Sequence, residues 1–195
     1  MKKLPVYKLV INEEDESGVS AIALVDDPAI ERNFVAFNKL KPLVFHQVGD
    51  RQILTGPLMV ADLPIYRRDP EKGEYYVIFD RATIEQIVYK FFRNKNVGEV
   101  NQMHDPMQPA EGVFMFESMI IDKARGIVTP QGFDEMPDGS WFGSFRVDNP
   151  EIWDNFIKTG DFKGFSVEGV FDMVEVANED EAVIQGLIDI IQNPQ

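Results

Sequence analysis

Short strand-like runs of apolar residues recur along the chain and are separated by turns rich in Gly, Pro, Asp and Asn. Clear examples are residues 6–11, 19–25, 74–79 and 113–121. Further runs of the same kind occupy residues 52–61, 97–103, 141–147 and 165–176, and a short one is expected at 34–37. Runs of this length between turn signals favour a core built on sheets, with most neighbouring strands antiparallel.

One segment has helical spacing instead. Residues 81–93 carry apolar side chains three and four positions apart, and Asp80 precedes them as an N-cap. The expected buried stripe consists of Ile84, Ile87, Val88, Phe91 and Phe92. A short helix beginning at Pro150 and a last helix over residues 183–191 are also predicted.

These elements predict an α+β fold, in which a mostly antiparallel, β-barrel-like sheet is flanked by helices. A length of 195 residues and a mass of 22.2 kDa fit one domain with at most a small appendage. We expect the main domain to span residues 1–176, with residues 1–45 as a semi-independent N-terminal arm. Residues 177–195 are expected to form an acidic turn and a C-terminal helix.

The charge balance excludes several classes of function. Acidic residues outnumber basic ones by 33 to 19, which gives a formal net charge of −14 and argues against nucleic-acid binding. The chain has no Cys, so a thiol nucleophile and a Cys-ligated metal are excluded. No signal peptide and no transmembrane run is apparent, and no cofactor or metal site is predicted. A site of action in the cytosol fits this composition.

Two residues carry the chemistry that the sequence favours. His104 follows the strand-like run at 97–103, and Ser166 lies between Gly164 and Gly169 near the start of another run. A serine hydroxyl becomes a nucleophile when a base accepts its proton, and imidazole is suited to that task near neutral pH. The small neighbours of Ser166 leave backbone N–H groups free for an oxyanion, with that of Val167 as the candidate.

A third residue is needed to orient the imidazole. Glu117 is the first candidate, because it interrupts the apolar run at 113–121. Asp172 and Glu168 are rivals, since both are expected on the same strand face as Ser166. The chain's other histidine, His46, is a further candidate for the third member, but a surface role is expected for it.

Several motifs resemble a known family in their order and spacing. They are residues 53–59 (ILTGPLM), 64–69 (PIYRRD), 74–76 (EYY), 117–118 (ES), 139–141 (GSW), 147–149 (VDN) and 164–169 (GFSVEG). Together they resemble the phage serine proteases of tailed phages and prophages, over roughly residues 5–173. That group is similar to the prohead proteases, which share a fold with the herpesvirus assemblins.

The resemblance implies a serine endopeptidase that cleaves scaffold and major capsid proteins, and in some cases itself, inside the immature phage head in the host cytoplasm. It implies Ser166 as nucleophile and His104 as base. In the wider superfamily the third member usually follows the nucleophile, but only 29 residues follow Ser166 here. Three alternatives follow. Glu117 or an acid near Ser166 takes the place of the third triad member, Ser166 and His104 act as a dyad, or the catalytic role is lost.

Two other functions remain as alternatives. A non-catalytic assembly protein with the same fold would bind scaffold or capsid partners, and the acidic surface and the apolar last helix favour it. An esterase or amidase acting on small substrates is the weaker alternative. Homo-oligomerisation through the last helix is expected by analogy with the assemblins.

Overall fold

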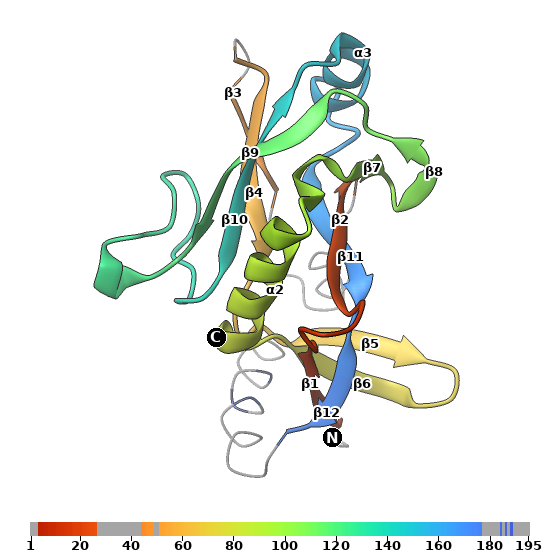
Figure 1. Ribbon diagram of the computed structural model, residues 1–195, viewed down its shortest axis with the longest axis vertical. Helices are drawn as coiled ribbons and strands as arrows, with labels where there is room; N and C mark the ends of the chain where they lie inside the picture. The colour runs from red at the N-terminus through yellow and green to blue at the C-terminus, as the bar shows by residue number, and fades with distance from the viewer. Residues whose placement is uncertain are drawn as a thin grey trace.

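The computed structural model describes residues 4–26, 44–48 and 51–176, together with residues 184, 186 and 188. The strands form three four-stranded sheets (Figure 1). The first has the order β12 (Asp172–Glu175), β1 (Val6–Val10), β6 (Gly73–Ile78), β5 (Ile65–Asp69). The second has the order β3 (His46–Val48), β4 (Ile53–Met59), β10 (Trp141–Val147), β9 (Val113–Ile120). The third has the order β11 (Gly164–Val170), β2 (Gly18–Val25), β7 (Val100–Gln102), β8 (Asp105–Pro109).

Neighbouring strands are antiparallel in each sheet except for the pairs β1–β6 and β2–β7. The α+β class is therefore confirmed. A barrel-like sheet is not observed, because within the described residues the three sheets are open and their edge strands do not pair with one another. The hydrogen-bonding groups on those edges are left for other contacts, as at the outer edge of β11.

The helix α2 (Arg81–Arg93) lies against β2 in the middle of the molecule (Figure 1). The Asp80 side chain accepts a hydrogen bond from the Thr83 backbone N–H, as expected of an N-cap. The predicted stripe is buried except for Phe92, which is 42% exposed. Phe91 packs edge-on against Trp141, with 5.3 Å between the ring centroids, and so joins the helix to the second sheet.

The predicted short helix is also present. Asn149 caps the α3 turn (Pro150–Ile152), Pro150 occupies its first position, and the chain continues as the π-helical segment η5 (Trp153–Ile157). The described residues also contain two 3₁₀ turns, η3 (Asn96–Gly98) and η4 (Lys123–Arg125).

The C-terminal strand region differs from the prediction. The run at 165–176 divides at Phe171, since β11 pairs with β2 while β12 pairs with β1 in another sheet. A bulge after Glu168 accompanies this change. Gly169 is needed there, because a Cβ at this position would lie 2.0 Å from the Gly18 carbonyl oxygen.

A second difference concerns residues 105–109, which are not among the runs predicted as strands. They form β8, the edge strand of the third sheet. Pro106 and Pro109 removed this segment from the predicted strands, but an edge strand tolerates proline where its missing N–H would face solvent.

The main core joins all three sheets. Its largest fully buried side chains include Ile22, Leu24, Leu54, Trp141 and Phe145. β1 and β2 contribute to this assembly, because β1 lies between β12 and β6 and β2 lies between β11 and β7. Whether residues 1–45 are semi-independent stays a prediction.

The C-terminal region lies largely outside the described residues, as does the strand expected at 34–37. Of the predicted last helix, residues 184, 186 and 188 are described and are helical. Ile184 and Ile188 are buried in a cluster with Val6, Tyr76 and Ile78.

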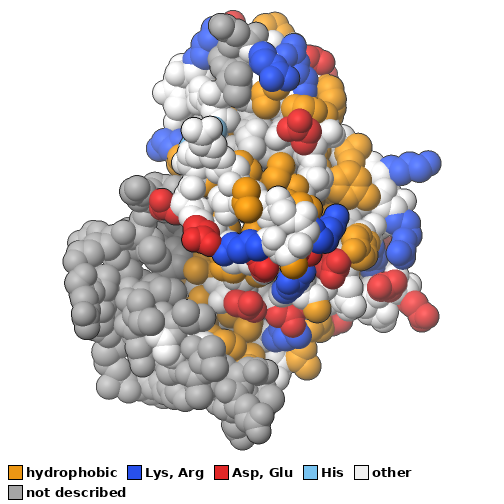
Figure 2. Space-filling view, turned by 90° about the vertical axis from the view of Figure 1, so that its left-hand side faces the viewer, with side chains coloured by type: hydrophobic (Ala, Val, Ile, Leu, Met, Phe, Trp, Pro, Cys, Tyr) orange, Lys and Arg blue, Asp and Glu red, His pale blue; other side chains and the backbone are white. Residues whose placement is uncertain are grey.

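On the face shown in Figure 2, acidic and basic side chains are interspersed, with hydrophobic side chains between them. Among the described residues, no helix is long and apolar enough to cross a membrane.

Candidate active site

Ser166 lies on β11, at the edge of the third sheet, and is 5% exposed. It pairs with Ala23 on β2, and Ala23 pairs in turn with Asn101 on β7. Residues opposite each other in a sheet point to the same side, so the Ser166 and Asn101 side chains share one face. Glu168 lies two residues beyond Ser166 on β11 and belongs to that face as well.

His104 reaches the same region from a tight turn. Met103 and His104 are the two residues between the paired positions Gln102 on β7 and Asp105 on β8. Their φ angles are +55° and +60°, in the left-handed region that such a two-residue hairpin requires and that Asn-Gly usually supplies. Non-glycine residues held in this way cost stability, and they concentrate at functional sites.

A carboxylate holds the imidazole in place. Nδ1 of His104 is 3.0 Å from Oε1 of Glu168, and the two side chains are 42% and 26% exposed. Nδ2 of Asn101 donates to the same Glu168 oxygen over 2.6 Å. The contact between Nδ1 and a carboxylate leaves the other ring nitrogen, Nε2, for a substrate or nucleophile.

Asn101 is buried, and its amide is only half satisfied. Because Nδ2 faces Glu168, the carbonyl Oδ1 points elsewhere, and no described residue donates a hydrogen bond to it. A buried polar atom without a partner is uncommon and calls for a water, an ion or a ligand group.

Within the described residues, no hydrogen bond joins His104 to Ser166. A single strand, β2, separates β11 from β7, so Ser166 and Asn101 are separated by about two strand spacings, roughly 10 Å. Catalytic hydrogen bonds are often long or absent without substrate and form in the substrate complex.

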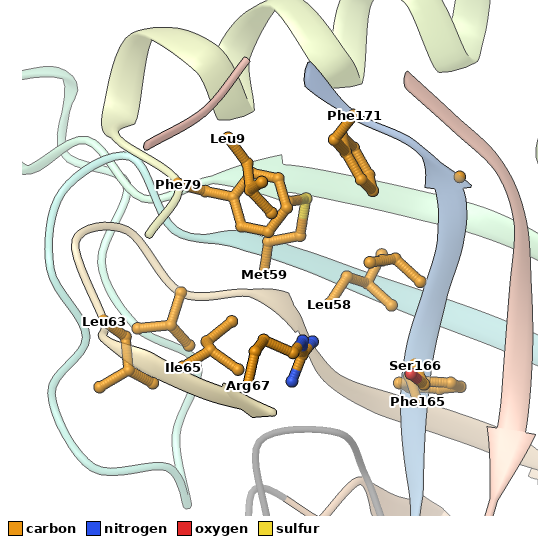
Figure 3. A pocket seen from close by; sticks show the side chains of 13 residues that line it. Leu9, Leu58, Met59, Leu63, Ile65, Arg67, Phe79, Phe165, Ser166 and Phe171 are labelled. Carbon is orange, nitrogen blue, oxygen red and sulfur yellow. The ribbon is translucent and has the colours of Figure 1, made fainter. Parts of the chain in front are cut away.

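A cavity of about 280 Å³ lies beside β11, on the side away from β2 (Figure 3). We call it the β11 pocket. Ser166 lines it, together with its β11 neighbours and Phe171. Apolar side chains of β1 and β4 and the residue after β6 complete this wall, among them Leu9, Leu58 and Phe79. Ser166 is the pocket's one hydroxyl residue among the described residues.

The hydrogen-bond pattern of the sheet directs the backbone N–H of Val167 toward this pocket. On β2, the Ile22 N–H donates to the Glu99 carbonyl and the Leu24 carbonyl accepts from Met103, so both residues face β7. Ala23 therefore faces β11 and pairs with Ser166, and the next residue, Val167, has its N–H directed away from β2. This direction leads to the free edge of β11 and the pocket.

Arg67 is the charged residue of the pocket lining. It lies on β5, and its guanidinium extends across the cavity toward β11 (Figure 3). The hydrogen bond of this side chain goes to the carbonyl of the adjacent Tyr66, over 3.2 Å. Burial lowers the pKa of Arg67, because desolvation penalises its charged form.

Comparison with known proteins assigns the family. Residues 43–175 match the model of the family described as "Putative phage serine protease XkdF". The chain belongs to this family of phage serine proteases. The suspected phage serine protease family is therefore confirmed, although the matched segment begins after β1 and β2. Neither the curated proteins nor the solved structures contain a match.

The family segment contains the residues considered from the sequence, but the structure does not bring all of them together. Glu117 lies on β9 and lines a separate hollow of about 570 Å³ beside α2. Asp172 was expected on the strand of Ser166, but it begins the next strand, β12, which pairs in another sheet. Of the three carboxylates, Glu168 is the one with a described contact to His104.

His46 lies apart from this site. It is exposed on β3, and its ring stacks on Phe133 with 4.1 Å between centroids. Within the part of the chain that the structure describes, no three His, Asp or Glu side chains group as metal ligands.

Two residues of the site were not found from the sequence. Asn101 was passed over because a lone polar residue in a short strand carries no signal until its neighbours are known. Arg67 belongs to a polar run, residues 66–69. Once this run is known to be the strand β5, alternation of side chains explains why Arg67 is half-buried and Arg68 is exposed, but the sequence alone does not distinguish the two.

Proposed function

We propose that the protein is a serine endopeptidase in which Ser166 is the nucleophile, His104 the general base and Glu168 the carboxylate that orients it. The observation that carries the proposal is the contact between His104 Nδ1 and Glu168 Oε1, on the sheet face that also bears Ser166. Glu168 replaces Glu117 in this role, because Glu117 lines a different hollow.

The chemistry follows from these positions. When Nδ1 of His104 carries the ring proton and donates a hydrogen bond to Glu168, the lone pair of Nε2 can accept the Ser166 proton. The Ser166 oxygen then attacks the scissile carbonyl, and the Val167 N–H donates to the oxyanion. His104 returns the proton to the leaving amine, and a water molecule, activated in the same way, hydrolyses the acyl-enzyme. Substrate binding must bring the imidazole and the hydroxyl into contact.

The substrates that we propose are the scaffold and major capsid proteins of the phage, cleaved within the immature head in the host cell, with self-cleavage of the protease. Membership of a phage serine protease family supports phage proteins as substrates. The open sheets leave the relation to the assemblin fold as a proposal, and so does assembly of the protein into homo-oligomers.

A fluorophosphonate probe tests the mechanism directly. We expect labelling of the wild-type protein at Ser166, no labelling of Ser166→Ala, and a rate of peptide cleavage lower by about 10³-fold or more in Ser166→Ala and His104→Ala. Ser20→Ala is the matched control, because Ser20 is exposed on β2 of the same sheet. Cleavage by Ser166→Ala at the wild-type rate would refute the mechanism.

The second candidate function is non-catalytic binding of scaffold or capsid partners by the same fold. The absence of a hydrogen bond between His104 and Ser166 within the described residues favours it. This alternative predicts that a folded, partner-bound protein is not labelled by the fluorophosphonate and that Ser166→Ala still supports head assembly.

A further inference from the structure

The Arg67 guanidinium has no carboxylate within ion-pair range among the described residues. It is half-buried in the β11 pocket, where its neighbours are apolar side chains such as Leu63, Ile65 and Phe79. A desolvated cation is costly unless an anion or several acceptors replace the lost water.

The other shielded cations of the protein are paired. Among the described residues, four Lys or Arg side chains are buried or half-buried: Lys8, Arg67, Lys90 and Arg146. Lys8 pairs with Asp80, Lys90 with Asp15 and Arg146 with Asp148. Arg67 is thus the exception in a chain with 33 acidic and 19 basic residues, where an internal partner would have been easy to supply.

The pocket therefore combines apolar walls with one cation, next to the proposed nucleophile. A side chain that suits it has an aliphatic stem for the walls and a carboxylate at its end for the guanidinium. Arginine binds carboxylates through two parallel hydrogen bonds, so such a ligand gains geometry as well as charge neutralisation.

We propose that Arg67 makes the β11 pocket a subsite for a carboxylate on an aliphatic stem, so that the protein selects peptides by an acidic group close to the scissile bond. This inference rests on the proposed function, because it specifies the substrate of the Ser166 site. Two sources supply a carboxylate for the guanidinium, a glutamate side chain within the peptide, which also has the aliphatic stem, and the main-chain carboxylate at a peptide's C-terminus.

The test uses a synthetic peptide library with randomised central positions, made once with amidated and once with free C-termini. The protein cleaves each library, and mass spectrometry identifies the sites. We expect Glu to be enriched at one position beside the cleaved bond in the amidated library. Enrichment of cleavage next to the free C-terminus, and only there, would instead assign the pocket to the terminal carboxylate. Both results support the carboxylate subsite.

Variants then connect the preference to Arg67. For a selected peptide, replacing the acid by its amide should lower kcat/KM by about ten- to a hundredfold in the wild type, because the guanidinium is left unpaired. Arg67→Gln should abolish this difference, and Arg67→Lys should restore part of it. Arg68→Gln is the matched control, since Arg68 is the exposed neighbour on the same strand. Urea unfolding establishes that each variant is folded.

Three outcomes overturn the inference while the proposed function stands. They are cleavage without any acidic preference, an acidic preference that persists in Arg67→Gln, and an equal loss of kcat/KM on acid and amide peptides. If the wild type cleaves nothing, the proposed function fails. The subsite is then tested by binding: the same peptide libraries are passed over immobilised Ser166→Ala protein, and the retained peptides are identified. Enrichment of acidic peptides that is lost in the Ser166→Ala, Arg67→Gln double variant supports it, and equal retention refutes it.

Discussion

Replacing Glu168 by Gln separates a catalytic carboxylate from a structural one. Oε1 of Glu168 lies 3.0 Å from His104 Nδ1 and 2.6 Å from Asn101 Nδ2. A glutamine carbonyl can still accept from Asn101, so the buried amide keeps its partner. The glutamine oxygen can still accept a hydrogen bond from His104 Nδ1, but it carries no charge. If the amide is flipped, its NH₂ group donates to Nδ1 and favours the tautomer with the proton on Nε2, which cannot act as the base.

The expected effects on stability and activity differ widely. The pair is partly exposed, at 42% for His104 and 26% for Glu168, so its loss should cost at most about 1 kcal/mol of unfolding free energy. The loss of an orienting carboxylate in a Ser-His-acid site lowers kcat by about 10⁴-fold, which corresponds to about 5 kcal/mol of transition-state stabilisation. Activity should therefore fall far more than stability.

The assay measures kcat/KM on a cleaved peptide and unfolding in urea for the wild type, Glu168→Gln and Glu117→Gln. Glu117→Gln is the matched control, because Glu117 is the rival carboxylate and lines a separate hollow. We expect it to leave both quantities unchanged. The assignment is refuted if Glu168→Gln retains wild-type activity, or if Glu117→Gln reduces activity as strongly.

Four further predictions concern the fold that supports the site. Asp80→Ala should lower the free energy of unfolding in urea by about 1–2 kcal/mol, because it removes the α2 cap and the partner of Lys8. Desolvation raises the pKa of Asp80, but hydrogen bonds from Lys8 and Thr83 outweigh it and lower this pKa below its ordinary value. The stabilisation by Asp80 should therefore be complete above the ordinary aspartate pKa and be lost as the pH falls through the lowered pKa of the folded state. Phe145→Ala should cost about 3–5 kcal/mol by calorimetry, because the ring is fully buried. Met103→Gly should raise stability by about 1 kcal/mol without lowering kcat/KM, since Met103 has a φ of +55°. Deleting residues 1–26 should abolish cooperative unfolding, because it removes β1 and β2; a folded deletion protein would support a semi-independent arm.

The local elements could be predicted wherever spacing alone determines them. α2 was found with its cap because four of its apolar residues point to one side, and α3 because Pro150 follows Asn149. Phe92 was misassigned because it borders the stripe, and the sequence does not say how wide the buried face is. β8 was missed because two prolines obscure an edge strand.

The arrangement of the strands could not be predicted, and the site depends on it. Nothing in residues 18–25 indicates that this strand lies between β11 and β7, yet this placement puts Ser166 and Asn101 on one face. The division of one apolar run at Phe171 is likewise set by partners in two sheets. For the same reason Glu117 was placed ahead of Glu168 from the sequence, since only strand pairing brings Glu168 to the turn of His104.

Three features of the candidate site have a structural cost. His104 and Met103 occupy left-handed conformations, Asn101 Oδ1 is buried without a donor, and Arg67 is half-buried without an anion. Such costs usually persist where a ligand or a reaction requires them. A fold retained only to bind partners on its surface would gain stability by relaxing each of these features. Arg67 lines the pocket of Ser166, and Asn101 lies on the sheet face of Ser166 beside the turn that holds His104. This placement favours a site that acts on a peptide over a passive assembly surface.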